Sequence, residues 1–236
     1  MKIMLDAGHF GKQNRSPILP EYYESVMTWE LSHRLQAALE QYGITVGQTR
    51  SQQEVDMPVY QRGKSSAGYD LFVSVHSNAF SDANIDRPTV FVNLDGSTTE
   101  LGKKIGASVR QVMGTSQKES ITWKEWEGRP GVEYYGVLRG AKDAGTPGMI
   151  IEHSFHTNLR SALWLSDSNN LERLAQAEAA VIAAHFGVST PVSEAVRWAQ
   201  EQGILKADAG GSYRLGEFCT REELAEALFR FRQIGT

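Results

Sequence analysis

Three residues that can bind a metal ion or transfer a proton stand at the ends of short apolar runs. They are His9, His76 and Glu152. Functional side chains of parallel α/β sheets gather at the carboxyl ends of the strands, so we expect these three to share one edge of a sheet. The runs that precede them, each typical of a buried strand, are residues 3–5, 71–75 and 148–151.

Glu24 stands three residues before the apolar stripe of the first predicted helix, and it therefore shares the face of that stripe at the helix N-terminus. Two imidazoles and a carboxylate leave one position open on tetrahedral zinc, which is typical of catalytic rather than structural sites. A further carboxylate can take a proton from water and pass it to a leaving nitrogen. From spacing alone, however, a histidine in a loop is more often a surface or hydrogen-bonded residue than a ligand.

Apolar periodicity predicts strands that alternate with helices, which indicates an α/β fold with a mostly parallel central sheet flanked by helices. Residues 10–20 and 115–132 are expected to be loops, the second of them a loop or lid. The predicted strands are residues 3–5, 44–46, 71–75, 89–92, 135–138 and 148–152, and the predicted helices are residues 27–42, 59–67, 101–113 and 171–186.

The composition excludes several classes of protein. The chain has 236 residues and a net charge of −4, so we expect no nucleic-acid partner. No apolar run approaches the roughly 20 residues of a membrane span, so we expect no membrane partner. Cys219 is the single cysteine, which rules out a disulfide within the chain.

Three motifs give the chain a resemblance to a known family. They are Leu5-Asp-Ala-Gly-His9-Phe-Gly11, Ser74-Val-His76-Ser-Asn-Ala79 and Met149-Ile-Ile-Glu152, with Glu24 before the first helix. Residues 1–187 resemble the zinc-dependent N-acetylmuramoyl-L-alanine amidases of the amidase-3 family. The resemblance implies an enzyme with zinc on His9, Glu24 and His76 and with Glu152 as the catalytic carboxylate. It also implies peptidoglycan as substrate, cleaved at the amide between N-acetylmuramic acid and L-alanine.

The chain departs from the family just after Glu152. Family members often read Glu-x-Gly-Phe there, whereas this chain has Ser154 in the glycine position and additional histidines at positions 153 and 156. These histidines either tune substrate binding or Glu152, or they merely replace small residues of the wall of the site. We take His153 as a substrate-binding candidate.

Three further residues are substrate-binding candidates. Asn78 belongs to the second motif, and Arg62 and Arg139 suit the carboxylates of the substrate. For the two arginines, ordinary surface salt bridges are an equally good interpretation.

Residues 193–236 form a second predicted module, joined to the catalytic domain (residues 1–187) by a linker at residues 188–192. The module resembles one S-layer-homology repeat: a helix, a glycine-rich turn at residues 210–211, and a second helix. Thr220 and Glu223 have the spacing of a capping box. Leu224, Leu228 and Phe231 give the second helix an apolar side. The resemblance implies cell-wall binding, and because one repeat has little core, a homodimer formed through this module is the alternative.

The first hypothesis is therefore a zinc amidase, and the alternatives are a non-catalytic wall-binding protein and a zinc peptidase of the stem peptide. The N-terminus lacks the basic region and the roughly 7–15 apolar residues of a signal peptide. We expect synthesis in the cytoplasm and action on the wall after release. A phage endolysin that leaves through a holin pore is favoured over a sporulation enzyme freed by mother-cell lysis.

Overall fold

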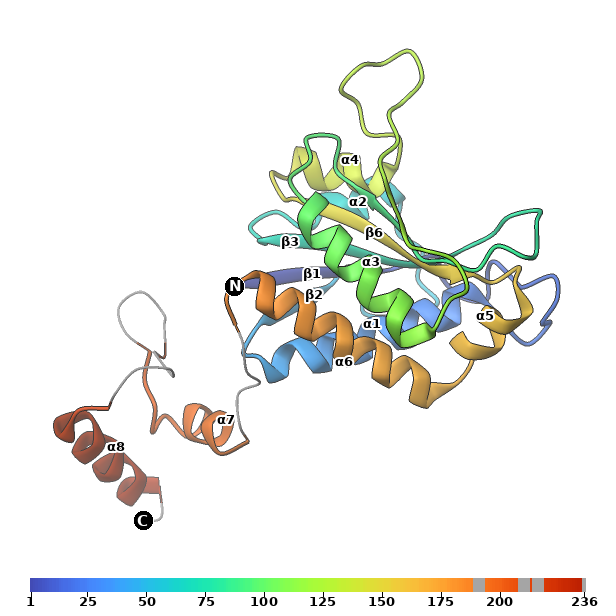
Figure 1. Cartoon of the computed structure of the whole chain (residues 1–236). Helices are drawn as coiled ribbons and strands as arrows, with labels where there is room; N and C mark the ends of the chain where they lie inside the picture. Colours follow the sequence, from blue (N-terminus) through green and yellow to red (C-terminus); the bar gives the residue numbers. More distant parts are fainter. Residues whose placement is uncertain (189–193, 208–212, 214–218, 235–236) are drawn as a thin grey trace. The chain divides into compact units, whose positions relative to one another are not determined.

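The computed structural model of the chain describes residues 1–188, 194–207, 213 and 219–234. The chain divides into two compact units, Met1–Ser189 and Thr190–Thr236 (Figure 1). The predicted linker lies outside the described residues except for its first residue, and so does the glycine-rich turn of the second module.

The first unit is built on one six-stranded sheet with the strand order β2-β1-β3-β6-β4-β5. Neighbouring strands run parallel, apart from the antiparallel pair of β4 and β6. This confirms the predicted α/β class with a mostly parallel sheet. The strands are β1 (Lys2–Ala7), β2 (Thr45–Gln48), β3 (Leu71–Asn78), β4 (Thr89–Val92), β5 (Ser120–Thr122) and β6 (Gly148–Phe155).

Helices cover both faces of this sheet. The helices α1 (Glu24–Gln41), α3 (Thr99–Met113) and α6 (Ser168–His185) pack on one face and enclose the larger apolar core. The helices α2 (Val59–Lys64) and α4 (Gly136–Asp143) cover part of the other face (Figure 1). A short helix, α5 (Leu159–Leu165), follows β6.

The close contact between α2 and α4 depends on two glycines. A Cβ at Gly63 would lie 1.9 Å from the carbonyl oxygen of Val137, and one at Gly140 would lie 2.1 Å from that of Tyr60. The two backbones therefore touch, which lets these short helices cover the sheet beside the site described below.

Two predicted segments differ from the structure. The sequence predicts a strand at residues 135–138, but residues 136–138 form the first turn of α4, so this prediction was wrong. A short apolar run fits a buried strand or a buried helix equally well, and here Val137, Leu138 and Ala141 face the sheet at helical spacing. Residues 115–132, predicted as a loop or lid, contain β5 and most of a hairpin in which the Trp126 N–H donates to the Val132 carbonyl oxygen.

The second unit contains α7 (Glu194–Glu201) and α8 (Arg221–Ile234). The predicted capping box at the start of α8 is confirmed. The Thr220 N–H donates to Glu223 Oε2 at 2.8 Å, and the Glu223 N–H donates to Thr220 Oγ1 at 3.1 Å. The predicted apolar side of α8 is more than half exposed, at Leu224, Leu228 and Phe231. Among the described helices, none has both the length and the apolar character that crossing a bilayer requires.

Candidate metal and catalytic site

The sheet brings His76 and Glu152 together. They are register partners on the neighbouring strands β3 and β6. Val75 and Ile151, one residue earlier on each strand, point into the larger core. Because side chains alternate along a strand, His76 and Glu152 both point to the opposite face, beside α2 and α4.

The loop after β1 carries His9 over His76. The backbone of His9 has a φ of 60°, a left-handed conformation that a residue with a Cβ rarely adopts. The Ala7 carbonyl oxygen accepts hydrogen bonds from Arg50 Nη2 at 2.7 Å and from Arg62 Nη1 at 3.1 Å. A Cβ at Gly8 would lie 2.5 Å from the His76 ring, so only glycine allows this loop to pack against that ring.

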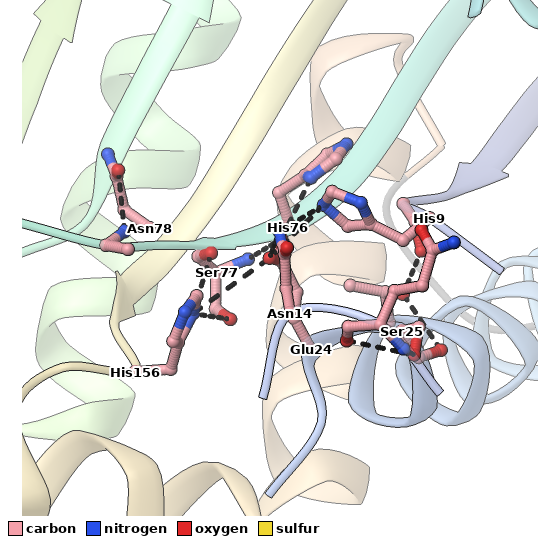
Figure 2. A network of polar contacts seen from close by, with 12 residues as sticks. His9, Asn14, Glu24, Ser25, His76, Ser77, Asn78 and His156 are labelled. Atoms are coloured by element: carbon pink, nitrogen blue, oxygen red, sulfur yellow. Dashed lines mark hydrogen bonds and ion pairs between the residues drawn. The ribbon is translucent and has the colours of Figure 1, made fainter. Parts of the chain in front are cut away.

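Glu24, the first residue of α1, lies between the two histidines (Figure 2). Its Oε1 lies 2.9 Å from His76 Nδ1 and accepts a 3.0 Å hydrogen bond from the Ser77 N–H. Its Oε2 lies 3.2 Å from His9 Nε2 and accepts a 2.8 Å hydrogen bond from Asn14 Nδ2. Burial would raise the pKa of Glu24, but the contacts with the two histidines lower it, so the group is a carboxylate.

The donor set fits a cation. One ligand atom from each of His9, Glu24 and His76 lies within 4.8 Å of the others. Burial would lower the pKa of His76, but the hydrogen bond with Glu24 and the charges of Glu152 and Glu24 raise it to about 9. The buried carboxylates thus favour a positive charge at this point. Two imidazole nitrogens and one carboxylate oxygen are the ligand types of catalytic zinc sites.

Glu152 has the properties of a proton-transfer group. Its Oε2 atom is buried and has no hydrogen-bond partner among the residues that the structure describes. Burial raises the pKa of this carboxyl group to about 7, with a lowering effect of His76 and a raising effect of Glu24. A carboxyl group with a pKa near neutrality is suited to accept and return a proton under ordinary conditions.

The family described as N-acetylmuramoyl-L-alanine amidase matches residues 3–184 of the chain, which are the residues that form this sheet and this site. The chain belongs to this family. Searching curated protein sequences gives no match.

Several solved structures share the fold of the first unit. The catalytic domain of the amidase CwlV from Bacillus (Paenibacillus) polymyxa var. colistinus has a TM-score of 0.68 at 19% identity, with 80% of this chain and 99% of that chain covered. CwlD from Clostridioides difficile, solved in complex with the GerS lipoprotein, has a TM-score of 0.67 at 21% identity and the same coverage. AmiC2 of Nostoc punctiforme has a TM-score of 0.66 at 19% identity, with coverages of 79% and 97%.

The predicted substrate-binding residues of the amidase differ in where they lie. Arg62 is 3% exposed and bonds backbone carbonyl groups, and His153 is fully buried. Neither is accessible to a substrate, so these two predictions were wrong. Arg139 donates to the backbone oxygens of Glu133 and Tyr134, and its role toward substrate stays a prediction. So does that of Asn78, which stands apart from the ligand cluster at the end of β3 (Figure 2).

Ser154, which departs from the family pattern, lies in a β-bulge just after Glu152. Pairing of β3 with β6 passes from His76–Glu152 to Asn78–Phe155, so β6 carries one extra residue. Ser154 lies in this bulge with a φ of 60°. Glycine adopts this conformation freely, which accounts for the glycine of the family pattern. In the amidase, the Ser154 hydroxyl donates instead to Asp86 Oδ1 at 2.9 Å.

Substitutions of Ser154 test this strain. Ser154→Ala and Ser154→Gly both lose the hydrogen bond to Asp86, but only glycine relieves the left-handed backbone. We expect both variants to be less stable than the wild type, and the alanine variant to be less stable than the glycine variant by about 1 kcal/mol. Urea unfolding of the three proteins measures the difference. An alanine variant as stable as the glycine variant would show that the backbone at position 154 is not strained.

The contacts that hold Glu24 in place from behind were not predicted from the sequence. Ser77 Oγ lies 2.7 Å from the Tyr22 hydroxyl oxygen and 3.0 Å from His156 Nδ1. The Tyr22 and His156 rings stack with centroids 5.7 Å apart. Since the Ser77 N–H also binds Glu24, this cluster holds the central carboxylate in place. The motif around His76 is the only signal that could have indicated Ser77, and Tyr22 had none.

Proposed function

We propose that this chain is a zinc-dependent N-acetylmuramoyl-L-alanine amidase that hydrolyses the amide between N-acetylmuramic acid and L-alanine in peptidoglycan. The observation that carries the proposal is the convergence of His9, Glu24 and His76 beside Glu152, whose buried Oε2 finds no partner within the described part of the chain. Membership of the amidase family supports the reaction and the substrate.

The chemistry divides between the ion and the chain. When bound by His9, Glu24 and His76, zinc supplies a Lewis acid that activates water and polarises the scissile carbonyl group. Glu152 Oε2 accepts the proton of the attacking water and delivers it to the leaving nitrogen of L-alanine. The hydrogen bonds of Glu24 to Ser77 and Asn14 keep its carboxylate oriented during both transfers.

End-group analysis of digested peptidoglycan tests this proposal against its alternatives. New L-alanine amino termini are expected from an amidase. Other new amino termini would mean a zinc peptidase of the stem peptide, and the absence of any new terminus would mean a non-catalytic wall-binding protein. Either of the last two results overturns the proposal.

For the second unit we propose a role in placing the enzyme on the wall, either by binding a wall polymer directly or by joining two chains into a homodimer. The exposed apolar side of α8, at Leu224, Leu228 and Phe231, supports a surface that contacts another molecule. Two weak wall contacts on one particle gain from a high effective concentration, so even modest affinity contributes. Release through a holin pore, or on mother-cell lysis, stays a prediction from the sequence.

Truncation after Thr190 tests the role of this unit. The first unit has its own sheet and core, so we expect the truncated enzyme to keep zinc and its activity on small soluble muropeptides. We expect its activity to fall mainly on intact walls. Sedimentation of both forms shows whether the second unit forms dimers, and Leu228→Ser serves as a point variant of the apolar side. Undiminished lysis of intact walls, or unfolding of the truncated chain, would contradict this role.

A further inference from the structure

A carboxylate lies in the apolar core behind the candidate site. Glu178 stands on the buried stripe of α6, four residues after Leu174 and four before Ile182. Its side chain is fully buried. Placing a carboxylate in the core is costly unless a partner compensates it, so the partner explains why Glu178 is there.

That partner is His153, which is also fully buried. His153 Nε2 lies 2.6 Å from Glu178 Oε1, and Nδ1 lies 2.9 Å from the backbone oxygen of His76. A carbonyl oxygen only accepts hydrogen bonds, so Nδ1 carries a hydrogen and donates it. The 2.6 Å contact is a charge-assisted hydrogen bond, in which one proton lies between the imidazole and the carboxylate.

The hydrogen bond from His153 joins β6 to its neighbour β3 at the point where the site is assembled. His153 directly follows Glu152, and it binds the backbone of His76, the register partner of Glu152. The extra residue of the β6 bulge interrupts the regular ladder immediately beyond this pair. The His153 side chain therefore links the two strands where the ladder between them becomes irregular.

We propose that Glu178 and His153 are positioning residues of the amidase: Glu178 orients the His153 ring, and His153 holds the His76 backbone so that the His76 imidazole and the Glu152 carboxylate keep their relative placement. This inference rests on the proposed function. It assigns a role in the reaction to two buried residues that touch neither the substrate nor the ligand atoms.

A purely structural role is the alternative, and the energetics of buried ion pairs make it testable. Replacing such a pair with well-packed apolar residues is often neutral or stabilising, so stability alone gives little reason to keep it. Removing a partner that orients a metal ligand typically costs 10–100-fold in metal affinity or activity. The two roles thus differ in kcat and zinc affinity rather than in folding.

Two substitutions of Glu178 separate geometry from charge. Glu178→Gln keeps the length of the side chain, and its amide can donate to Nε2 of a neutral His153, so we expect kcat and zinc affinity within about threefold of the wild type. Glu178→Asp keeps the charge but is one methylene shorter, so it draws the ring away from His76. For this variant we expect kcat about tenfold lower, an unchanged KM and a zinc dissociation constant about tenfold higher.

The double variant His153→Leu/Glu178→Leu removes the link altogether. We expect it to fold, with kcat and zinc affinity reduced 10–100-fold. Glu172→Gln is the control, since this residue lies on the same helix but is half exposed and pairs with Arg34 at the surface. Turnover on a soluble muropeptide gives kcat and KM, competition with a chromophoric chelator gives zinc affinity, and thermal unfolding reports the fold.

The rank order of the glutamine and aspartate variants decides the inference even if the double variant fails to fold. An aspartate variant closer to the wild type than the glutamine variant would overturn positioning in favour of charge balance. A folded double variant with wild-type kcat and zinc affinity would overturn it as well. A wild-type chain that releases no L-alanine termini would instead refute the proposed function, so the two failures are distinguishable.

Discussion

Glu152→Gln is expected to lower the turnover of a soluble muropeptide by roughly 10²–10⁴-fold while the protein keeps its zinc. Glutamine has nearly the size of glutamate, but it can neither accept the proton of the attacking water nor return it to the leaving nitrogen. The metal should stay because His9, Glu24 and His76 converge without any contribution from Glu152. Turnover assays and metal analysis of the same preparation measure both quantities.

The pH profile gives a second readout of Glu152. As a base the carboxyl group must be ionised, and burial raises its pKa to about 7. We therefore expect the wild-type rate to rise with pH while the carboxyl group ionises and to level off once it is fully ionised. Glu172→Gln should reproduce this profile. Loss of zinc from Glu152→Gln would make Glu152 a ligand and would require a different mechanism.

The features of the site that the sequence could predict are those that depend on a single strand or helix. His76 and Glu152 end apolar runs, and the structure pairs these two residues across β3 and β6. Glu24 precedes an apolar stripe, and it is the first residue of α1. In each case a local pattern specifies where the residue stands in its element, and parallel packing then brings the ends of the elements together.

Features that depend on pairing between distant segments were not predictable. In the sequence Ser154 replaces the glycine of the family pattern, whereas its left-handed conformation depends on the extra residue in β6 relative to β3. His153 is a substrate-binding candidate by sequence because it adjoins Glu152, yet strand alternation turns it to the opposite face. Glu178 interrupts the apolar stripe of α6, which signals a buried acid but does not identify its partner.

The substrate-binding prediction for Arg62 failed for a related reason. Arg62 was assigned to substrate because a guanidinium group suits carboxylates, but its partners are backbone oxygens and the side chains of Asp6 and Asp56. Buried arginines commonly hold irregular backbone, since one guanidinium group offers five donors in a fixed geometry. Here Arg62 supports the loop that carries His9, so it acts on the site through the backbone.

His76→Ala is expected to abolish zinc binding and to lower activity by more than about 10³-fold, because Lewis-acid stabilisation is worth several kcal/mol in the transition state. His76 is one of the three proposed ligand side chains among the described residues, and its ring also packs against Gly8 below the His9 loop. The substitution therefore removes one ligand and loosens a second. The fold should persist, since the neighbouring β3 side chains that form the core, Val73 and Val75, are untouched.

The matched control for this substitution is His33→Ala. His33 is exposed on α1, where its ring contacts Trp29 and no residue of the site. We expect this variant to hold about one zinc per chain and to remain fully active. Chelation of the wild type should reproduce the loss seen in His76→Ala, and added zinc should restore the wild type but not the variant. A His76→Ala protein that retained both its zinc and its activity would exclude the ligand set of His9, Glu24 and His76.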